Sequence, residues 1–154
     1  MAFFAEASIE TSASPERVFD TLADHDSWAA WMPPSFKPAS GARPLGRLRR
    51  GSKPKVTITA NGMALPAKLK VTVADRPREI TWCGGVRGVM RAEHRFMLEA
   101  LPNGGTRIRS IERWTGVVAG VLRRIVKPTA ESIGRDQIDA IATEAESGTH
   151  HAHV

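Results

Sequence analysis

Two side chains able to transfer protons, His94 and Glu112, occur in neighbouring stretches of alternating polar and apolar residues. The segment 93–114 predicts two strands, and Pro-Asn-Gly-Gly at 102–105 is typical of a turn that would join them. Because side chains alternate between the two faces of a strand, His94, Glu112 and Ser110 are expected on the inner, mostly apolar face. An imidazole and a carboxylate on such a face need either a chemical or a structural explanation.

The pairing register of the two strands decides whether these groups meet. If Leu98 lies opposite Ile108, the same register places His94 opposite Glu112. Partners across a strand pair have Cβ atoms about 5 Å apart, within reach of a hydrogen bond or an ion pair. A carboxylate can orient a histidine and raise its pKa, which would suit a general acid or base in aldol cyclisation or dehydration.

Several interpretations of the pair stay open. His94 and Glu112 could act as a catalytic acid–base pair, or they could contact a bound ligand. They could also satisfy each other as a buried structural pair, or His94 could bond a backbone group. Arg95 and Arg113 flank the pair, and although alternation points both outward, either could reach round and neutralise Glu112.

Large aromatic side chains and methionines form a second set of candidates, as residues that line a site for a hydrophobic ligand. Flat rings and flexible thioethers suit sterols, polyketides or fatty acyl chains. Ordinary core packing is the alternative interpretation for each of them. The chain has no tyrosine, so no phenol is available to polarise a carbonyl group. The expected ligand-binding residues are Trp28, Trp31, Met32, Phe36, Trp82, Met90, Phe96, Ser110, Trp114, Val118 and Leu122.

Metal, thiol and nucleotide chemistry are not expected. Cys83 should face away from the inner face, and no base is evident beside it in the sequence. His150, His151 and His153 lack a carboxylate or cysteine partner in fixed geometry, so no metal site is predicted. Glycines at 84, 85 and 88 resemble a phosphate loop only in composition, because the Lys-Ser/Thr ending is missing. No cofactor is therefore expected.

Length and composition predict a single domain without a membrane-spanning segment. The chain has 154 residues, of which 42% are hydrophobic and 25% charged. No apolar run approaches the ~18 residues that a membrane helix needs, and the first residues lack the features of a secretory signal. A single cysteine excludes an internal disulfide framework, so a reduced, cytoplasmic location is expected.

The formal net charge is +6, and the densest basic stretch is Arg43–Lys55. Surfaces that bind single-stranded nucleic acid interleave aromatic rings with their basic residues, and this stretch contains no aromatic residue. Nucleic-acid binding is therefore not expected. The stretch is expected to form a solvated loop and strand edge, with an anion-attracting rim as the alternative.

The pattern of apolar residues predicts one strand, two short helices, six further strands and one long helix. Ser14 and Pro15 suit the cap and first position of a helix. Pro128 lies inside the long C-terminal helix and is expected to kink or break it. The expected strands are 2–12, 36–39, 55–60, 67–74, 79–83 and the two within 93–114. Three helices are expected: one that begins at 14–17, one at 27–32 and one at 117–146.

This order predicts an α+β fold in which the long helix covers one face of a seven-stranded antiparallel sheet. Residues 1–147 are expected to form this single domain, and residues 148–154 a disordered tail.

The order of several segments resembles the helix-grip fold of the SRPBCC, or START and Bet v 1-like, superfamily, in particular its polyketide cyclase/dehydrase-like branch. The resemblance covers about residues 2–146. It implies a curved sheet wrapped around a long C-terminal helix, with a cavity between them that binds hydrophobic small molecules. The segments that carry it are the N-terminal strand with Ser14–Phe19, the short helix at Trp28–Pro33, the hairpin at Val73–Trp82, Glu93–Phe96, and Glu112–Trp114 before the last helix.

The sequence departs from that family pattern in two places. Arg43–Lys55 is irregular where a long strand is usual, and Pro128 interrupts the main helix. The resemblance transfers no catalytic residues, because its members range from ring-closing enzymes to lipid carriers.

The leading functional prediction is binding of a hydrophobic small molecule, such as a lipid, sterol or polyketide. The first alternative is a cyclase or dehydratase that uses His94 and Glu112 as an acid–base pair. The second alternative is a partner-binding module, such as a homodimer formed through exposed sheet edges. No integral membrane association is expected.

Overall fold

The computed structural model describes residues 2–147, so the predicted disordered tail and its three histidines lie outside the described residues. The elements follow the predicted order of strand, short helices, strands and long helix. They are β1 (Phe3–Thr11), α1 (Pro15–Ala23), the 3-10 turn η1 (His25–Ser27), α2 (Trp28–Trp31), β2 (Phe36–Pro38), β3 (Lys55–Ala60), β4 (Met63–Asp75), β5 (Glu79–Val86), β6 (Met90–Ala100), β7 (Thr106–Thr115), α3 (Val117–Val121) and α4 (Arg123–Ser147).

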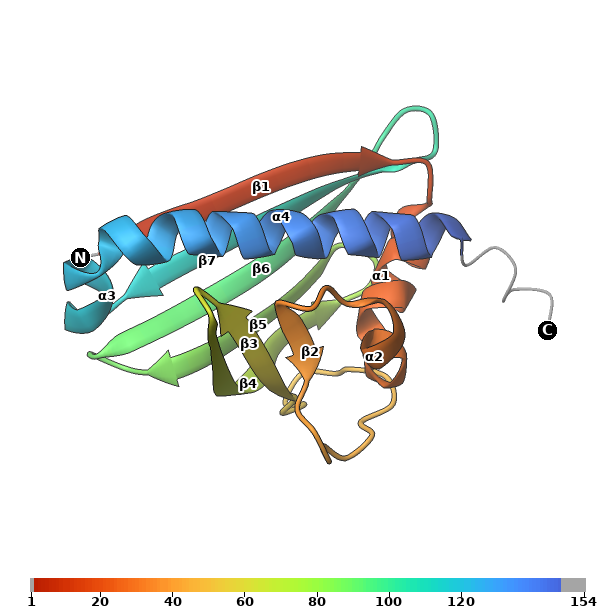
Figure 1. Cartoon of the computed structure of the whole chain (residues 1–154). Coiled ribbons are helices and arrows are strands. Elements are labelled where there is room, and N and C mark those ends of the chain that lie inside the picture. Colours follow the sequence, from red (N-terminus) through yellow and green to blue (C-terminus); the bar gives the residue numbers. More distant parts are fainter. Residues whose placement is uncertain (1, 148–154) are drawn as a thin grey trace.

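The seven strands form one antiparallel sheet in the order β1-β7-β6-β5-β4-β3-β2. Strands adjacent in sequence are therefore neighbours, except that β1 pairs with β7. Figure 1 shows the sheet curling around α4, with α1 and α2 at one end and α3 at the other. The predicted α+β helix-grip fold, with a curved seven-stranded antiparallel sheet, is confirmed.

The hairpin of β6 and β7 has the register predicted from the sequence. Leu98 lies opposite Ile108, and His94 lies opposite Glu112. A one-residue slip would move the inner apolar side chains to the outer face, so the alternating pattern specifies the register strongly. The turn is closed by Asn103, whose side-chain oxygen accepts a hydrogen bond from the Gly105 amide at 2.9 Å.

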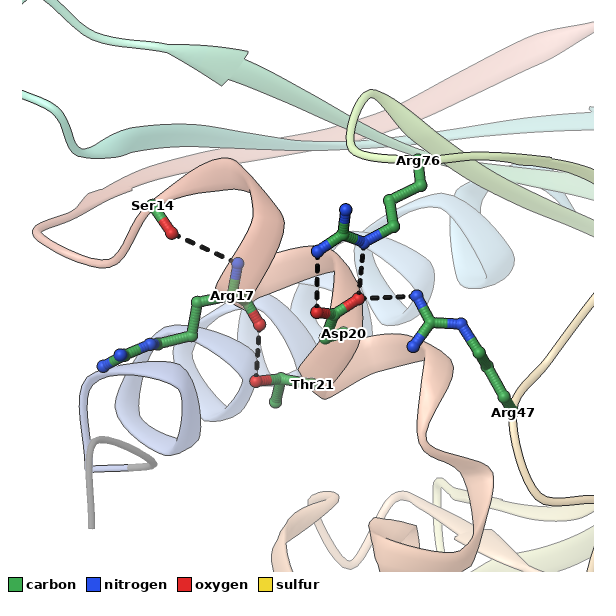
Figure 2. A network of polar contacts seen from close by, with 6 residues as sticks. All are labelled: Ser14, Arg17, Asp20, Thr21, Arg47 and Arg76. Carbon is green, nitrogen blue, oxygen red and sulfur yellow. Dashed lines mark hydrogen bonds and ion pairs between the residues drawn. The ribbon is translucent and has the colours of Figure 1, made fainter. Parts of the chain in front are cut away.

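Helix α1 begins as the sequence predicts. The Ser14 hydroxyl oxygen accepts a hydrogen bond from the Arg17 amide at 3.3 Å (Figure 2), and Pro15 takes the first helical position. The apolar side of the helix, which includes Phe19 and Leu22, is buried in the core. Helix α1 thereby closes the end of the sheet opposite α3.

The basic Arg43–Lys55 segment is docked against the fold. Leu48 is 2% exposed, and its amide donates a hydrogen bond to the Ala23 carbonyl at 2.7 Å. Arg47 contacts Asp20 of α1 at 2.6 Å, and Arg76 from the β4–β5 turn binds the same carboxylate at 2.9 and 3.0 Å (Figure 2). Asp20 thus links a helix, the long loop and a strand turn.

The C-terminal helical region is interrupted at Leu122, so the prediction of a break at Pro128 is wrong, whereas a kink at Pro128 stays a prediction. Helix α3 ends at Val121 and α4 runs from Arg123 to Ser147, with Pro128 inside it. Proline removes one backbone hydrogen bond, and close to the start of a long helix the later turns still make theirs. At Leu122 the backbone leaves the helical region (φ −93°, ψ 13°).

Helix α4 lies along the concave side of the sheet (Figure 1). None of the helices among residues 2–147 is both long enough and apolar enough to span a membrane. The buried residues of α4 are Ala130, Gly134, Gln137, Ile138, Ile141, Ala142 and Ala145.

Candidate functional site

A chain of four polar groups crosses the inner face of β6 and β7. The Nδ1 atom of His94 lies 3.1 Å from a carboxyl oxygen of Glu112. The Nε2 atom of the same ring lies 2.6 Å from the Ser110 hydroxyl oxygen. The second oxygen of Glu112 accepts a hydrogen bond from the Trp114 indole at 2.9 Å. Both ring nitrogens of His94 therefore contact side chains two residues apart on β7.

Burial determines which protonation states of these polar side chains are favoured. His94 is 4% exposed and Glu112 is 8% exposed. Burial lowers the pKa of His94 to about 3. Burial also raises the pKa of Glu112 to about 7, although the Trp114 indole opposes that rise. Both shifts disfavour the charged forms, so burial opposes an ion pair and favours contact between two neutral groups.

The neutral state assigns each proton. A protonated Glu112 donates to Nδ1 of His94, which leaves the ring proton on Nε2 to donate to the Ser110 oxygen. The Ser110 hydroxyl proton then remains available for another acceptor. This order differs from that of a serine-hydrolase triad, in which Nε2 must accept the serine proton. The distances fit either proton order, and it is the neutral state favoured by burial that makes Ser110 a terminal hydrogen-bond donor instead of a nucleophile.

The neighbouring arginines do not neutralise the pair. Arg95 points to the other face of the sheet, where its guanidinium lies 3.3 and 3.4 Å from the carboxylate of Glu79. Arg113 is exposed on the same outer face, opposite Glu93. Alternation along the strand therefore holds for both residues.

Helix α4 comes close to the sheet at Gly134. A Cβ atom at this position would lie 3.0 Å from the Ser110 oxygen, so Ser110 faces a part of the helix that carries no side chain. One turn along, Gln137 is 1% exposed, and neither its oxygen nor its nitrogen has a hydrogen-bond partner among residues 2–147. A buried amide without partners costs free energy, so Gln137 is a candidate functional residue.

Most of the predicted aromatic residues form one connected cluster. The Trp82 ring contacts Trp28, Phe36 and Phe96 at centroid distances of 5.5, 5.8 and 5.0 Å. The His94 ring stacks on Phe96 at 4.1 Å and meets the edge of Trp82 at 5.7 Å. Met32 is also buried in this core. The rings therefore connect the polar chain directly to the hydrophobic core.

The other predicted ligand-binding residues lie at the margins of this cluster. Trp31 is partly buried against the core, and its indole donates to the Ser27 hydroxyl at 2.8 Å. Trp114 is half-buried and stacks on Phe3 at 6.3 Å. Met90 is half-buried at the start of β6. Val118 and Leu122 are 38% and 39% exposed, so they lie outside the inner group.

Two buried polar residues whose side chains have no hydrogen-bond partner within residues 2–147 were not among the predicted site residues. Gln137 falls in the apolar stripe of the last helix, and a polar residue in that stripe is the signal that could have found it. His25 is 4% exposed beside Trp28, at 5.0 Å between ring centroids, and neither ring nitrogen has a hydrogen bond among the described residues. Burial lowers the pKa of His25 despite the nearby Asp26. Its position between two aspartates gives no sign of burial.

A surface cleft of about 370 Å³ separates α4 from the β3–β4 turn. Pro128 and Ile133 line it on the helix side, and Thr59 and Asn61 line it on the strand side. The Asn61 amide approaches the Thr129 hydroxyl at 3.5 Å across the gap. Within residues 2–147, no three histidine, cysteine, aspartate or glutamate side chains gather as a metal site would require.

Comparison with solved structures shows the same fold at low sequence identity. The aromatase/cyclase Zhui from a Streptomyces species aligns with a TM-score of 0.76 and 16% identity, over 97% of this chain and 96% of that one. A norcoclaurine synthase mutant from Thalictrum flavum, in complex with a transition-state analogue, gives 0.73 and 11% over 97% of both chains. Ara h 8.0201 gives 0.64 and 17%, over 96% of this chain and 99% of that one.

The sequence comparison identifies the family. No curated protein matches this chain. The profile of the family described as "polyketide cyclase / dehydrase and lipid transport" matches residues 4–146. That match spans nearly the whole sheet and both C-terminal helices. The fold is the helix-grip fold of SRPBCC/Bet v 1-like proteins, and the chain belongs to the polyketide cyclase/dehydrase and lipid transport family.

Proposed function

We propose that this protein binds a hydrophobic small molecule with a polar head group between the sheet and α4. The observation that carries the proposal is the unpartnered carboxamide of Gln137, which is 1% exposed on the inner side of α4. A buried amide can donate and accept hydrogen bonds, and a ligand carbonyl or hydroxyl would supply the partner that residues 2–147 do not provide. The family description, which includes lipid transport, supports a ligand of this class.

The Glu112–His94–Ser110 chain would supply the second polar contact. Its last proton, on the Ser110 hydroxyl, can be donated to a carbonyl or hydroxyl oxygen of the ligand. The aromatic cluster of Trp28, Trp82 and Phe96 would pack against the apolar body of the ligand. A lipid, sterol or polyketide that combines a ring or chain with one oxygen function fits these groups.

A binding screen tests this proposal. Native mass spectrometry of the purified protein, and thermal shift with fatty acids, sterols and aromatic polyketides, should identify a bound class. Replacing Gln137 by Leu should weaken that binding by about tenfold, the effect of losing about 1.4 kcal/mol of hydrogen bonding. The same variant should unfold at a higher temperature without ligand, because it no longer buries an unpaired amide.

Two controls keep the result interpretable. Asp139→Asn changes an exposed residue on the same helix and should alter neither property. If no compound shifts the melting temperature and none co-purifies, the binding proposal fails. If compounds bind equally well to Gln137→Leu, the assignment of Gln137 fails and the site lies elsewhere.

Catalysis of cyclisation or dehydration is the second candidate function, and the hydrogen-bonded Glu112–His94–Ser110 chain is the observation that favours it. Such a chain could pass a proton to a substrate carbonyl during an aldol step. If it does so, His94→Gln should abolish turnover of a poly-β-ketone substrate while the ligand still binds. Turnover that survives in His94→Gln would exclude this role.

The remaining proposals concern setting and partners. The single, buried Cys83 suits a reduced compartment, and we propose the cytoplasm. We also propose that the basic residues do not bind nucleic acid, because Arg43–Lys55 contains no aromatic residue on which bases could stack. A homodimer through the sheet edges stays a prediction, and a concentration-dependent mass would reveal it.

A further inference from the structure

One end of the molecule carries an unusual concentration of exposed aliphatic side chains. The β5–β6 turn contributes Val86 and Val89, which are 63% and 47% exposed. Helix α3 and the start of α4 contribute Val117, Val121 and Ile125, which are 73%, 79% and 58% exposed. We call these five residues the apolar end. Contiguous exposed apolar surface on a soluble fold commonly marks an interaction site.

The two segments form one surface because backbone bonds join them. The amide of Val117 donates to the Gly88 carbonyl at 3.1 Å, and that of Val118 donates to the Val89 carbonyl at 2.9 Å. Gly116 permits this approach: it has φ +108°, and a Cβ there would lie 2.3 Å from the Val89 oxygen. Figure 1 shows α3, the start of α4 and the β5–β6 turn together at one end of the fold.

The charged side chains that accompany the apolar end are all basic. Arg87 and Arg91 belong to the turn segment, and Arg123, Arg124 and Lys127 belong to the helical segment. Neither 80–92 nor 113–130 contains an aspartate or glutamate. None of the five cations has an ion pair with residues 2–147, whereas Arg47, Arg76, Arg95 and Arg107 all do.

We propose that this end of the molecule docks onto the surface of an anionic lipid bilayer. Exposed aliphatic residues flanked by arginine and lysine are the composition of a surface that lies in the headgroup region. The apolar side chains would enter the boundary of the acyl chains, and the cations would meet lipid phosphates and carboxylates. A protein partner fits less well, because the two aromatic residues of these segments, Trp82 and Trp114, are buried and half-buried instead of exposed as interface anchors.

Co-sedimentation with vesicles tests the docking surface. Wild-type protein should bind phosphatidylserine/phosphatidylcholine vesicles more strongly than pure phosphatidylcholine, and added salt should weaken the difference. Arg124→Gln and Arg87→Gln should each lower the partition coefficient about fivefold. Val121→Asp should cause a larger loss, because it places a carboxylate where an apolar side chain would insert. All three residues are exposed, so circular dichroism spectra and melting temperatures should stay unchanged.

Arg50→Gln is the matched control, since it removes one exposed positive charge from the basic loop instead of the apolar end. If it weakens binding as much as Arg124→Gln, net charge explains the binding and the proposed surface is wrong. The proposal also fails if neither vesicle sediments the protein or if neutral vesicles bind it equally. A concentration-dependent mass that Val121→Asp abolishes, without vesicle binding, would assign the apolar end to a second copy of this chain instead.

Discussion

The buried His94–Glu112 pair shows how burial can override the charge that a contact suggests. At 3.1 Å an imidazole and a carboxyl group have the spacing of an ion pair. Creating two charges in a low-dielectric interior costs more than their attraction returns unless further hydrogen bonds satisfy both. Here the Trp114 indole and the Ser110 hydroxyl each satisfy one atom of the pair. Each group thus has only one hydrogen bond beyond the pair, and burial still raises the pKa of Glu112 and lowers the pKa of His94, so the neutral forms are favoured.

The pH dependence of stability tests this assignment. Glu112 has a pKa of about 7 in the folded protein and an ordinary value of 4.5. Because the folded-state pKa is raised, its contribution is fully present below pH 4.5 and is lost as the pH rises through about 7. Relative to Glu112→Gln, the wild type should therefore lose up to about 3 kcal/mol of unfolding free energy across this window.

Glu112→Gln is a suitable reference because its amide can still donate to His94 and accept from Trp114. The depressed pKa of His94 destabilises both proteins as the pH falls below 6.5, so it cancels from the difference. Urea denaturation at a series of pH values gives the two curves. Parallel curves between pH 4.5 and 8 would mean that Glu112 is ionised throughout.

At the scale of single residues, strand alternation predicts which side chains contact each other across the strands. It does not predict which buried polar side chains lack a hydrogen-bond partner. The contact between His94 and Glu112 follows from a period of two and a short turn. The isolation of Gln137 depends on how α4 is rotated over the sheet, which side chains far apart in the sequence decide. The burial of His25 is not predictable for the same reason, because it depends on how the Trp28 ring packs against it in three dimensions.

Among the elements, the docking of the long β2–β3 loop depends on one carboxylate. Asp20 of α1 receives Arg47 from the loop and two hydrogen bonds from Arg76 of the β4–β5 turn (Figure 2). The hydrogen bonds from Arg76, followed by those from Arg47, lower the pKa of Asp20 although partial burial opposes them. The three side chains are 41–49% exposed, so water screens much of their attraction.

Removing that carboxylate charge should increase local opening of the loop, whereas it should lower the free energy of unfolding only slightly. Asp20→Asn should cost about 1 kcal/mol, and it should speed hydrogen exchange at the amides of Arg47 and Leu48. The cost should vanish as the pH falls below the pKa of Asp20, because the wild-type carboxylate is then protonated too. Asp139→Asn should change neither the free energy of unfolding nor these exchange rates. If both variants lose the same free energy of unfolding, the contacts of Asp20 with Arg47 and Arg76 do not stabilise the fold.

The elements themselves are largely predictable, and the exceptions have physical causes. Period-two alternation and Asn61-Gly62 give the β3–β4 hairpin, in which both turn residues have positive φ. The position of the helix break is not predictable from Pro128 alone. A proline near the start of a helix disrupts few bonds, whereas the interruption at Leu122 directly follows a short helix whose first amides bond the β5–β6 turn.

For the molecule as a whole, the proposed interior site and the surface cleft differ in chemistry. The interior between the sheet and α4 offers the aromatic cluster and the polar groups of Gln137 and Ser110. The cleft of about 370 Å³ beside the β3–β4 turn includes polar side chains such as Asn61, Thr129 and Asp136 in its lining. A hydrophobic ligand should prefer the interior, because apolar area drives its transfer from water.

Hydrogen exchange distinguishes the two places. Core amides of β6, β7 and α4 exchange mainly through global unfolding, whereas amides of an exposed turn exchange through local opening. A ligand bound in the interior at 100 times its dissociation constant adds about 2.7 kcal/mol to global stability, so the core amides should slow about 100-fold. The amides of Asn61, Gly62 and Met63 should then keep their rates, because their local opening does not release the ligand. Slowing at this turn as well would place the ligand in the cleft beside Asn61 and Thr129, and it would overturn the interior site.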